Sequence, residues 1–245
     1  MPMGESPRPI IVFTDGAAKG NPGPGGWAAV LVTPGGRVRE LGGGTRHTTN
    51  NRMELTGPIE ALAVLKSVPG NVSIHTDSTY VIRGISEWIP NWVRRGWRTV
   101  EGKDVLNREL WEQLWQWVRE RGDGVKWHYV RGHQGIPGNE RVDEIANAFA
   151  LNEDPGLYEG PLTDYTVNIF DIPSDTSLPK SSGSNSPGKN AKPYSYLSVV
   201  DGVPMRHANW PDCEQRVKGR SGARFKKAMS AQDEAEILRS WGVRL

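Results

Sequence analysis

Four acidic residues stand where the sequence predicts that strands and helices begin or end. Asp15 and Asp77 each follow a short apolar run, Glu54 lies in the first turn of a predicted helix, and Asp143 lies in the first turns of another. Loops at one edge of an α/β sheet converge, so we expect these carboxylates to lie together. Clustered carboxylates repel one another unless a divalent cation neutralises them, and oxygen ligands suit Mg²⁺ or Mn²⁺ better than zinc.

Each acid also has a simpler interpretation when it is taken alone. An acidic residue at a helix N-terminus, such as Glu54 or Asp77, stabilises the helix by roughly 0.3–1 kcal/mol through capping and the helix dipole. Only the combination of the four acids with their neighbouring motifs favours a metal site over capping.

The apolar periodicity predicts the elements that position these acids. Three strands broken by Gly and Pro turns come first, and strands then alternate with helices, which implies a mixed sheet covered by helices. After the three strands, the predicted elements are a helix over 52–66, a strand over 72–77, a helix from 77–78, a helix over 107–121, a strand over 125–130 and a helix over 139–151.

The 245 residues carry a formal net charge of only +2, which excludes a globally cationic nucleic-acid binder. Charge and composition change along the chain, and a stretch rich in Ser, Gly, Pro and Asn predicts a flexible spacer. The division is an N-terminal tail over 1–9, an α/β domain over 10–152, an acidic and then Ser/Gly/Pro-rich linker over 153–193, and a small α+β domain over 194–245.

Two further patterns concern the linker and the compartment. The alternation in 165–172 predicts an extra strand within the acidic part of the linker. The single Cys213 excludes an intramolecular disulfide and a multi-cysteine zinc site, and we expect it to be a buried apolar residue. Neither a signal peptide nor an apolar run long enough to span a membrane is present, so we expect a cytoplasmic protein, monomeric and without membrane contact.

Five short motifs occur in an order and spacing that resemble type 1 ribonuclease H, in its bacterial ribonuclease HI form. They are TDGAAKGNPGPGG (14–26), TTNNRMEL (48–55), TDSTYV (76–81), EWIPNWVRRGWRT (87–99) and RGHQGIPGNERVDEIA (131–146). The resemblance covers residues 10–151. It implies the ribonuclease H fold, a five-stranded mixed sheet with three antiparallel and two parallel strands flanked by helices, and endonucleolytic cleavage of the RNA strand of RNA–DNA hybrids.

The resemblance also implies roles for the acidic residues. Asp15, Glu54, Asp77 and Asp143 become the ligands of two Mg²⁺ ions, with Mn²⁺ as a substitute, and the products carry 5′-phosphate and 3′-hydroxyl ends. His133 lies in a Gly-flanked loop, where an imidazole with an ordinary pKa near ~6.5 can shuttle a proton or assist product release.

Several polar residues match positions that contact nucleic acid in the family. Asn21, Asn50 and Asn51 match residues that line the minor groove, where short amides can read the 2′-hydroxyl of RNA. Asn107 and Thr49 match residues around a phosphate of the DNA strand. The family pattern is broken at two positions, because Thr79 replaces a common Gln and His47 replaces an Arg that some relatives use in the phosphate pocket.

A local basic and aromatic segment follows the third acidic motif, TDSTYV. Trp92 and Trp97 flank Arg94 and Arg95, so stacking faces and guanidinium groups are available to hold the DNA strand. We expect Trp92 and Trp97 to combine packing with contact, and Trp88 to belong mainly to the core.

The last part of the chain contains the patterns W-x-x-C (210–213), V-K-G (217–219), G-A-R-F-K-K (222–227) and E-A-E (234–236). With these, residues 194–245 resemble the hybrid-binding domain of some type 1 ribonucleases H, a domain related to viroplasmin. That domain is N-terminal in the family and C-terminal here. The resemblance implies that Trp210 and Phe225 contact the DNA strand, and that Lys226 and Lys227 contact its backbone. Double-stranded RNA stays open as a second ligand, and we expect the module to increase hybrid affinity or processivity.

Three functions remain in competition. The first is a Mg²⁺-dependent nuclease specific for RNA–DNA hybrids. The second is a non-catalytic binding protein of the same fold that recognises hybrid or double-stranded RNA, although such a protein has no need of all four acids. The third keeps the fold and metals but acts on another substrate, as integrases and junction nucleases do, and the glycine-rich and TTNNRMEL motifs argue against it.

Overall fold

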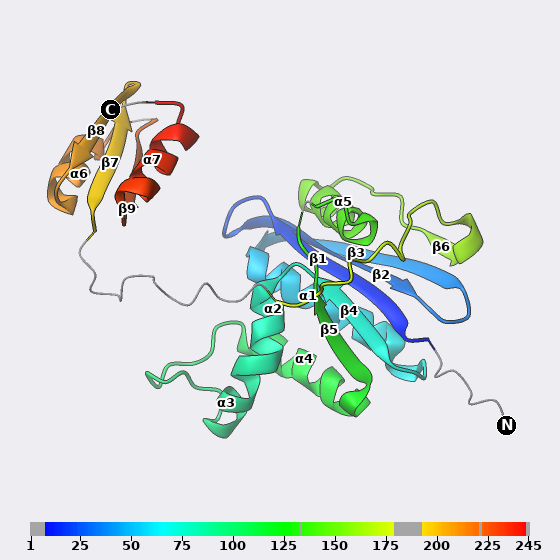
Figure 1. The fold of residues 1–245 in the computed structure, drawn as a ribbon. Helices are drawn as coiled ribbons and strands as arrows, with labels where there is room; N and C mark the ends of the chain where they lie inside the picture. The colour runs from blue at the N-terminus through cyan, green and yellow to red at the C-terminus, as the bar shows by residue number, and fades with distance from the viewer. Residues whose placement is uncertain (1–7, 133, 179–192, 221, 244–245) are drawn as a thin grey trace. The chain divides into compact units, whose positions relative to one another are not determined.

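The computed structural model describes residues 8–132, 134–178, 193–220 and 222–243 (Figure 1). The chain divides into two compact units after Leu178, and each is described by itself. Among the described residues, every helix is too short or too polar to cross a bilayer.

The first unit is built on a mixed six-stranded sheet with the order β5-β4-β1-β2-β3-β6. Strand β1 pairs antiparallel with β2 and parallel with β4, which joins the hairpin strands to the parallel ones. The strands are β1 (Ile10–Ala18), β2 (Gly23–Val32), β3 (Arg37–Thr48), β4 (Val72–Thr76), β5 (Val125–Tyr129) and β6 (Glu159–Pro161). The α-helices are α1 (Asn50–Val64), α2 (Thr79–Arg83), α3 (Ile89–Arg94), α4 (Arg108–Arg121) and α5 (Pro137–Leu151).

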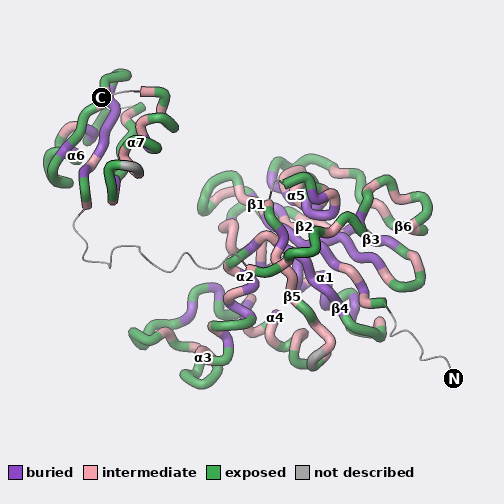
Figure 2. Tube along the Cα trace, in the orientation of Figure 1, coloured by how far each residue is buried: buried purple, intermediate pink, exposed green. Residues whose placement is uncertain are grey.

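Successive strand residues face opposite sides of this sheet and build two cores. Val12 packs with residues of α1 and α4 on one face, whereas Phe13 packs with residues of α5 on the other. Figure 2 shows the buried residues concentrated along the central strands. Trp111 of α4 is fully buried and lies so close to Gly84 that any Cβ there would collide with its indole.

The ribonuclease H topology that the motifs implied is confirmed, with two differences. The sheet has six strands rather than five, because β6 pairs antiparallel with the outer strand β3. Asp15 lies inside β1 rather than near its end, because pairing with β2 continues as far as Ala18. The parallel pairing with β4 stops at Phe13, so Asp15 lies just beyond the end of the parallel ladder.

Residues 153–178, placed in the linker by their composition, pack onto the first unit. The predicted strand over 165–172 is wrong, because these residues follow a 3₁₀ turn, Leu162–Asp164, and form no strand. Their apolar side chains dock individually, and Ile169 is buried in the core beneath α5. Further along, the backbone N–H of Tyr129 donates to the carbonyl of Thr176 at 3.0 Å.

A buried ion pair anchors this segment. The Glu40 side chain is fully buried and accepts two hydrogen bonds from Arg141, each at 2.8 Å. The hydroxyl of Tyr165 and the backbone N–H of Tyr158 also donate to it, at 2.6 and 2.9 Å. Burial would raise the pKa of Glu40, but these hydrogen bonds outweigh it and hold the pKa below its usual value.

The second unit is a three-stranded antiparallel sheet with two helices. Its order is β8-β7-β9, and β7 and β8 form an antiparallel hairpin. Leu197, Ala228 and Ile237 form its small core, and Cys213 is fully buried as expected. The elements are β7 (Ser195–Val200), β8 (Val203–His207), α6 (Trp210–Val217), β9 (Arg224–Ala228) and α7 (Ala231–Ser240).

Removing the Tyr165 hydroxyl should destabilise the first unit. Tyr165→Phe deletes a donor to a buried charge, so we expect a loss of about 1.5–3 kcal/mol in unfolding free energy, measured by urea denaturation. Tyr158→Phe is the matched control, because that hydroxyl donates only to the carbonyl of Pro161 in an exposed position. Its expected cost is below about 0.5 kcal/mol. Equal costs for the two variants would contradict the role given to Tyr165.

Candidate active site

Asp15 lies at the centre of the acidic cluster. Asp15 is only 8% exposed, and its Oδ1 accepts a hydrogen bond from the backbone N–H of Gly16 at 2.7 Å. Burial raises the pKa of Asp15 well above its ordinary value, and the charges of Asp77, Asp143 and Glu54 raise it further. The structure therefore brings together the four acids that the sequence singled out.

Glu54 reaches the cluster from α1. The amide of Asn50 donates to its Oε1 at 2.8 Å, and the hydroxyl of Ser78 donates to its Oε2 at 2.7 Å. Burial, followed by the charge of Asp77, raises the pKa of this carboxyl despite both hydrogen bonds. Gly16 allows the close approach of α1, because a Cβ on Gly16 would collide with the backbone of Met53 and Glu54.

Asp77 follows β4 directly and faces the loop after β5. The amide of the buried Asn139 donates to its Oδ2 at 3.4 Å. Gly132 leaves space for this carboxylate, since a Cβ there would lie 2.5 Å from the same oxygen. His133, the predicted proton carrier, lies outside the described residues.

Asp143 joins the cluster from the second turn of α5. The side-chain amide of Asn147 donates to its Oδ1 at 2.8 Å and to its backbone carbonyl at 2.9 Å. One residue outside the cluster, Lys19, donates in turn to the amide oxygen of Asn147 at 2.6 Å.

The donor set suits a hard divalent cation, because it consists of carboxylates that are partly desolvated and repel one another. Among the described residues, no three acidic, histidine or cysteine side chains have their donor atoms already arranged to hold a metal ion. The oxygens of Glu54 and Oδ1 of Asp143 are instead engaged by neighbouring amides and a hydroxyl. Each of these oxygens keeps a second lone pair, so the hydrogen bonds orient the carboxylates without excluding a cation.

Of the two residues predicted for a phosphate pocket, Asn107 is linked to helix α1 through Arg52. Asn107, in a left-handed conformation before α4, accepts from Arg52 at 3.3 Å and donates to the hydroxyl of Tyr80 at 3.3 Å. Arg52 also pairs with Glu109 at 2.5 Å. Thr49 is the N-cap residue of the same helix that carries Arg52, although its side chain makes no capping hydrogen bond.

The predicted minor-groove residues fall into two environments. Asn21 is exposed in the turn between β1 and β2, whereas Asn50 and Asn51 are half-buried at the start of α1. The amide of Asn50 is engaged by Glu54. The two departures from the family pattern, His47 and Thr79, are both exposed.

The aromatic segment after α2 is largely a packing element. Trp92 lies 5.6 Å from Trp111 and 6.3 Å from Trp97 between ring centroids, and both Trp92 and Trp97 are half-buried against the core. Arg94 and Arg95 are exposed at the end of α3. The two arginine side chains are thus exposed to solvent, while the indoles of Trp92 and Trp97 mainly pack this segment against the core.

In the second unit, Tyr196, Trp210 and Phe225 form a row with centroid separations of 5.8 and 5.5 Å. Trp210 is 36% exposed and Phe225 is 51% exposed. Strand register places Lys227 opposite Tyr196, on the face of the row, and Lys226 opposite Leu197, on the other face. The two lysines therefore do not share one surface.

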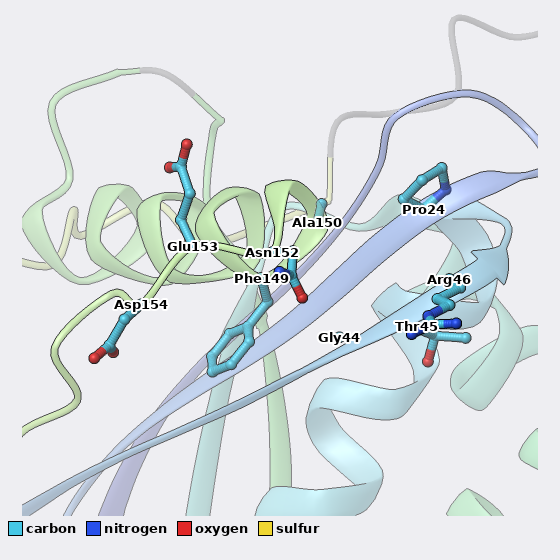
Figure 3. A pocket seen from close by; sticks show the side chains of 9 residues that line it. All are labelled: Pro24, Gly44, Thr45, Arg46, Phe149, Ala150, Asn152, Glu153 and Asp154. Atoms are coloured by element: carbon cyan, nitrogen blue, oxygen red, sulfur yellow. The ribbon is translucent and has the colours of Figure 1, made fainter.

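A pocket between the β2–β3 hairpin and the C-terminal end of α5 is separate from the acids. Figure 3 shows Phe149 and Asn152 on its helical side and Thr45 and Arg46 on its strand side. None of the four clustered acids lines it.

Sequence reasoning missed four polar residues that hold the acids. Ser78 and Asn139 contact Glu54 and Asp77, and Asn147 and Lys19 form the chain of hydrogen bonds to Asp143. The spacing of Asn147, four residues after Asp143, was a usable signal, because such residues are neighbours on a helix. Nothing local in the sequence points from Lys19 to Asn147.

The first unit is an α/β domain in which β1, α1, α5 and the residue after β4 each contribute one acid to a common site. This combination of a mixed sheet and an acidic site is the basis for comparing it with known families. The RNase H family model matches residues 7–150. Ribonuclease H of Polaromonas naphthalenivorans is 51% identical over 146 residues, covering 60% of this chain and 89% of the relative. Ribonuclease H of Cupriavidus pinatubonensis is 54% identical over 138 residues, covering 56% and 92%.

A crystal structure of LC9-RNase H1, described as a type 1 RNase H with the type 2 active-site motif, is 31% identical with a TM-score of 0.55. The match covers 65% of this chain and 82% of that one. The chain therefore belongs to the ribonuclease H family, and its first unit is a hydrolase.

Relieving the repulsion at Asp15 should stabilise the metal-free protein. Because its pKa is higher in the folded state, folding binds a proton, and stability rises as the pH falls through the window above the ordinary value of 3.8. Asp15→Asn mimics the protonated form. We expect its Tm near pH 7.5, in chelator, to exceed the wild-type value by about 2–4 °C for each kcal/mol of relieved repulsion.

This gain should shrink as the pH falls, because the wild-type carboxyl then takes up its own proton. Asp104→Asn is the control, since Asp104 is exposed and pairs only at 3.9 Å with Arg98. A pH-independent difference between Asp15→Asn and wild type would contradict the electrostatic explanation.

Proposed function

We propose that the protein is an endonuclease that hydrolyses the RNA strand of RNA–DNA hybrids, leaving 5′-phosphate and 3′-hydroxyl ends. The observation that carries this proposal is the cluster of Asp15, Glu54, Asp77 and Asp143 on the ribonuclease H fold. Relatives more than 50% identical over this region are named ribonuclease H.

We infer that the four acids hold two Mg²⁺ ions, with Mn²⁺ as a substitute. Bound divalent ions supply an activated water and stabilise charge on the leaving oxygen. The chain's own part is to present desolvated oxygens at fixed positions: Gly16 orients Asp15, while Asn50 and Ser78 orient Glu54. His133 stays the proposed carrier of a proton to or from the product.

Recognition of the hybrid is assigned to residues around the cluster. Asn21, Asn50 and Asn51 flank the acids and can read 2′-hydroxyl groups. Asn107, Thr49 and the neighbouring Arg52 form a polar site suited to one phosphate of the DNA strand. The exposed Arg94 and Arg95, with Trp92 and Trp97 supporting them, would hold that strand further along.

Removing one ligand should abolish cleavage. Asp77→Asn keeps the size of the side chain but removes a negative charge, so we expect the rate on a labelled hybrid to fall by about 10³-fold or more, equivalent to about 4 kcal/mol. Asp104→Asn should cleave like wild type. Mg²⁺-dependent cleavage retained by Asp77→Asn would show that the metal assignment is wrong.

We further propose that the second unit grips the hybrid through the row of Tyr196, Trp210 and Phe225, with Lys227 beside it. Aromatic faces and an ammonium group on one surface bind a nucleic-acid strand without sequence preference. Tethering this grip to the first unit raises the local concentration of substrate at the active site, which favours repeated cleavage of long hybrids.

Phe225→Ala should weaken hybrid binding by about 5-fold or more, corresponding to roughly 1 kcal/mol of lost stacking. Anisotropy with a labelled hybrid, in the inactive Asp77→Asn background, measures it. Phe170→Ala is the control, because Phe170 is equally exposed, at 55% against 51%, but lies in the first unit. A loss seen only with double-stranded RNA would reassign the ligand, and no loss would remove the aromatic row from binding.

A further inference from the structure

A chain of hydrogen bonds leads from the glycine-rich turn after β1 to Asp143. Lys19 donates from its Nζ to the Oδ1 of Asn147 at 2.6 Å. The Nδ2 of Asn147 then donates to Oδ1 of Asp143 at 2.8 Å. Residues 128 positions apart in sequence are thus joined through one amide.

The orientation of this amide is determined by its partners. An ammonium group can only donate and a carboxylate can only accept, so the amide oxygen must face Lys19 and the nitrogen must face Asp143. The same Nδ2 also donates to the backbone carbonyl of Asp143 at 2.9 Å, which likewise can only accept. Every hydrogen-bonding direction of the amide group is therefore consistent with one orientation, and the positive charge of Lys19 polarises it toward the acid.

Asp143 needs such a support because its neighbours repel it. The charge of Asp143 acts on the buried Asp15, and that repulsion favours any rotamer that turns the Asp143 carboxylate away from the cluster. The amide holds Oδ1 against this force. Among the described residues no hydrogen bond is made to Oδ2, so the second oxygen is left available to a ligand.

The other end of this series of hydrogen bonds lies in the turn after β1. The proposed function assigns that turn to recognition of the RNA strand. The backbone N–H of Lys19 donates to the carbonyl of Pro24 at 2.7 Å, which closes the turn carrying Asn21. The ammonium of Lys19 therefore also ties the turn that would read the RNA strand to the helix that carries Asp143.

We propose that Asn147 and Lys19 are positioning residues for Asp143, with Lys19 acting through the amide of Asn147. This inference rests on the proposed metal role of Asp143, and it assigns to these two residues the task of holding one carboxylate in place before Mg²⁺ arrives. Neither residue touches the reacting atoms.

The test is a double-mutant cycle in the full chain, with Lys19→Met, Asn147→Ala and the double variant. Calorimetric titration with Mg²⁺, without nucleic acid, should show affinity about 10-fold weaker for Asn147→Ala, the usual range for loss of a residue that orients a metal ligand. Lys19→Met should weaken it less, and the double variant should be no worse than Asn147→Ala, because Lys19 acts through Asn147. The Mg²⁺ concentration for half-maximal cleavage should rise in parallel.

Asn91→Ala is the matched control. Asn91 likewise donates to the carbonyl four residues earlier, in Glu87, and accepts from the cation Arg94 at 2.6 Å, but it lies away from the acids. We expect its Mg²⁺ affinity to equal that of wild type. Lys19→Arg should restore most of what Lys19→Met loses, and melting curves of every variant separate lost positioning from unfolding. Lys19 is exposed, so Lys19→Met tests the proposal even where Asn147→Ala melts early.

Two results would overturn the inference. Wild-type Mg²⁺ affinity in both single variants would show that Asp143 needs no support. Wild-type Mg²⁺ affinity in Lys19→Met, with a change only in the salt dependence of KM for the hybrid, would make Lys19 a direct phosphate contact instead. The metal assignment itself is tested separately with Asp143→Asn, because Mg²⁺-dependent cleavage retained by that variant would remove the proposed function and not merely its support.

Discussion

Repulsion among carboxylates around a buried Asp15 is the constraint on which the rest of the first unit depends. Burial and three neighbouring acids all oppose its ionisation. Holding such a cluster without a cation lowers the stability of the folded protein. The cluster therefore persists only where the surrounding structure supplies enough stability to offset the repulsion. The sheet, the helices on both of its faces and the hydrogen bonds to each acid can be understood as the means by which this chain keeps the four charges together.

Support comes from both faces of the sheet. On the side of α1, Asn50 and Ser78 hold Glu54, and on the side of α5, Asn147 holds Asp143. Helix α5 is itself anchored by the ion pair between Arg141 and Glu40, which the segment 153–178 completes. Segment 153–178 is therefore structurally part of the first unit, because its Tyr158 and Tyr165 complete the hydrogen bonding of the buried Glu40 carboxylate.

The second unit combines a small core with a partly exposed row of aromatic side chains. Its core rests on Leu197, Ala228 and Ile237, and its aromatic row stays partly exposed rather than contributing to that core. Large exposed aromatic side chains in so small a unit are costly unless they bind something, which is the physical reason for assigning them a nucleic-acid strand. The near-neutral charge of the whole chain hides this division between an acidic site and local basic surfaces.

The sequence by itself determined the order and type of most elements, the four acids and the family, because apolar periodicity and short motifs are local properties. It could not place Tyr165, whose alternating neighbourhood resembles a strand although its hydroxyl serves Glu40. It also could not separate Lys226 from Lys227, or join Lys19 to Asn147. Strand register and contacts between distant residues decided these points, because they depend on how the elements pack and not on the order of residues within any one of them.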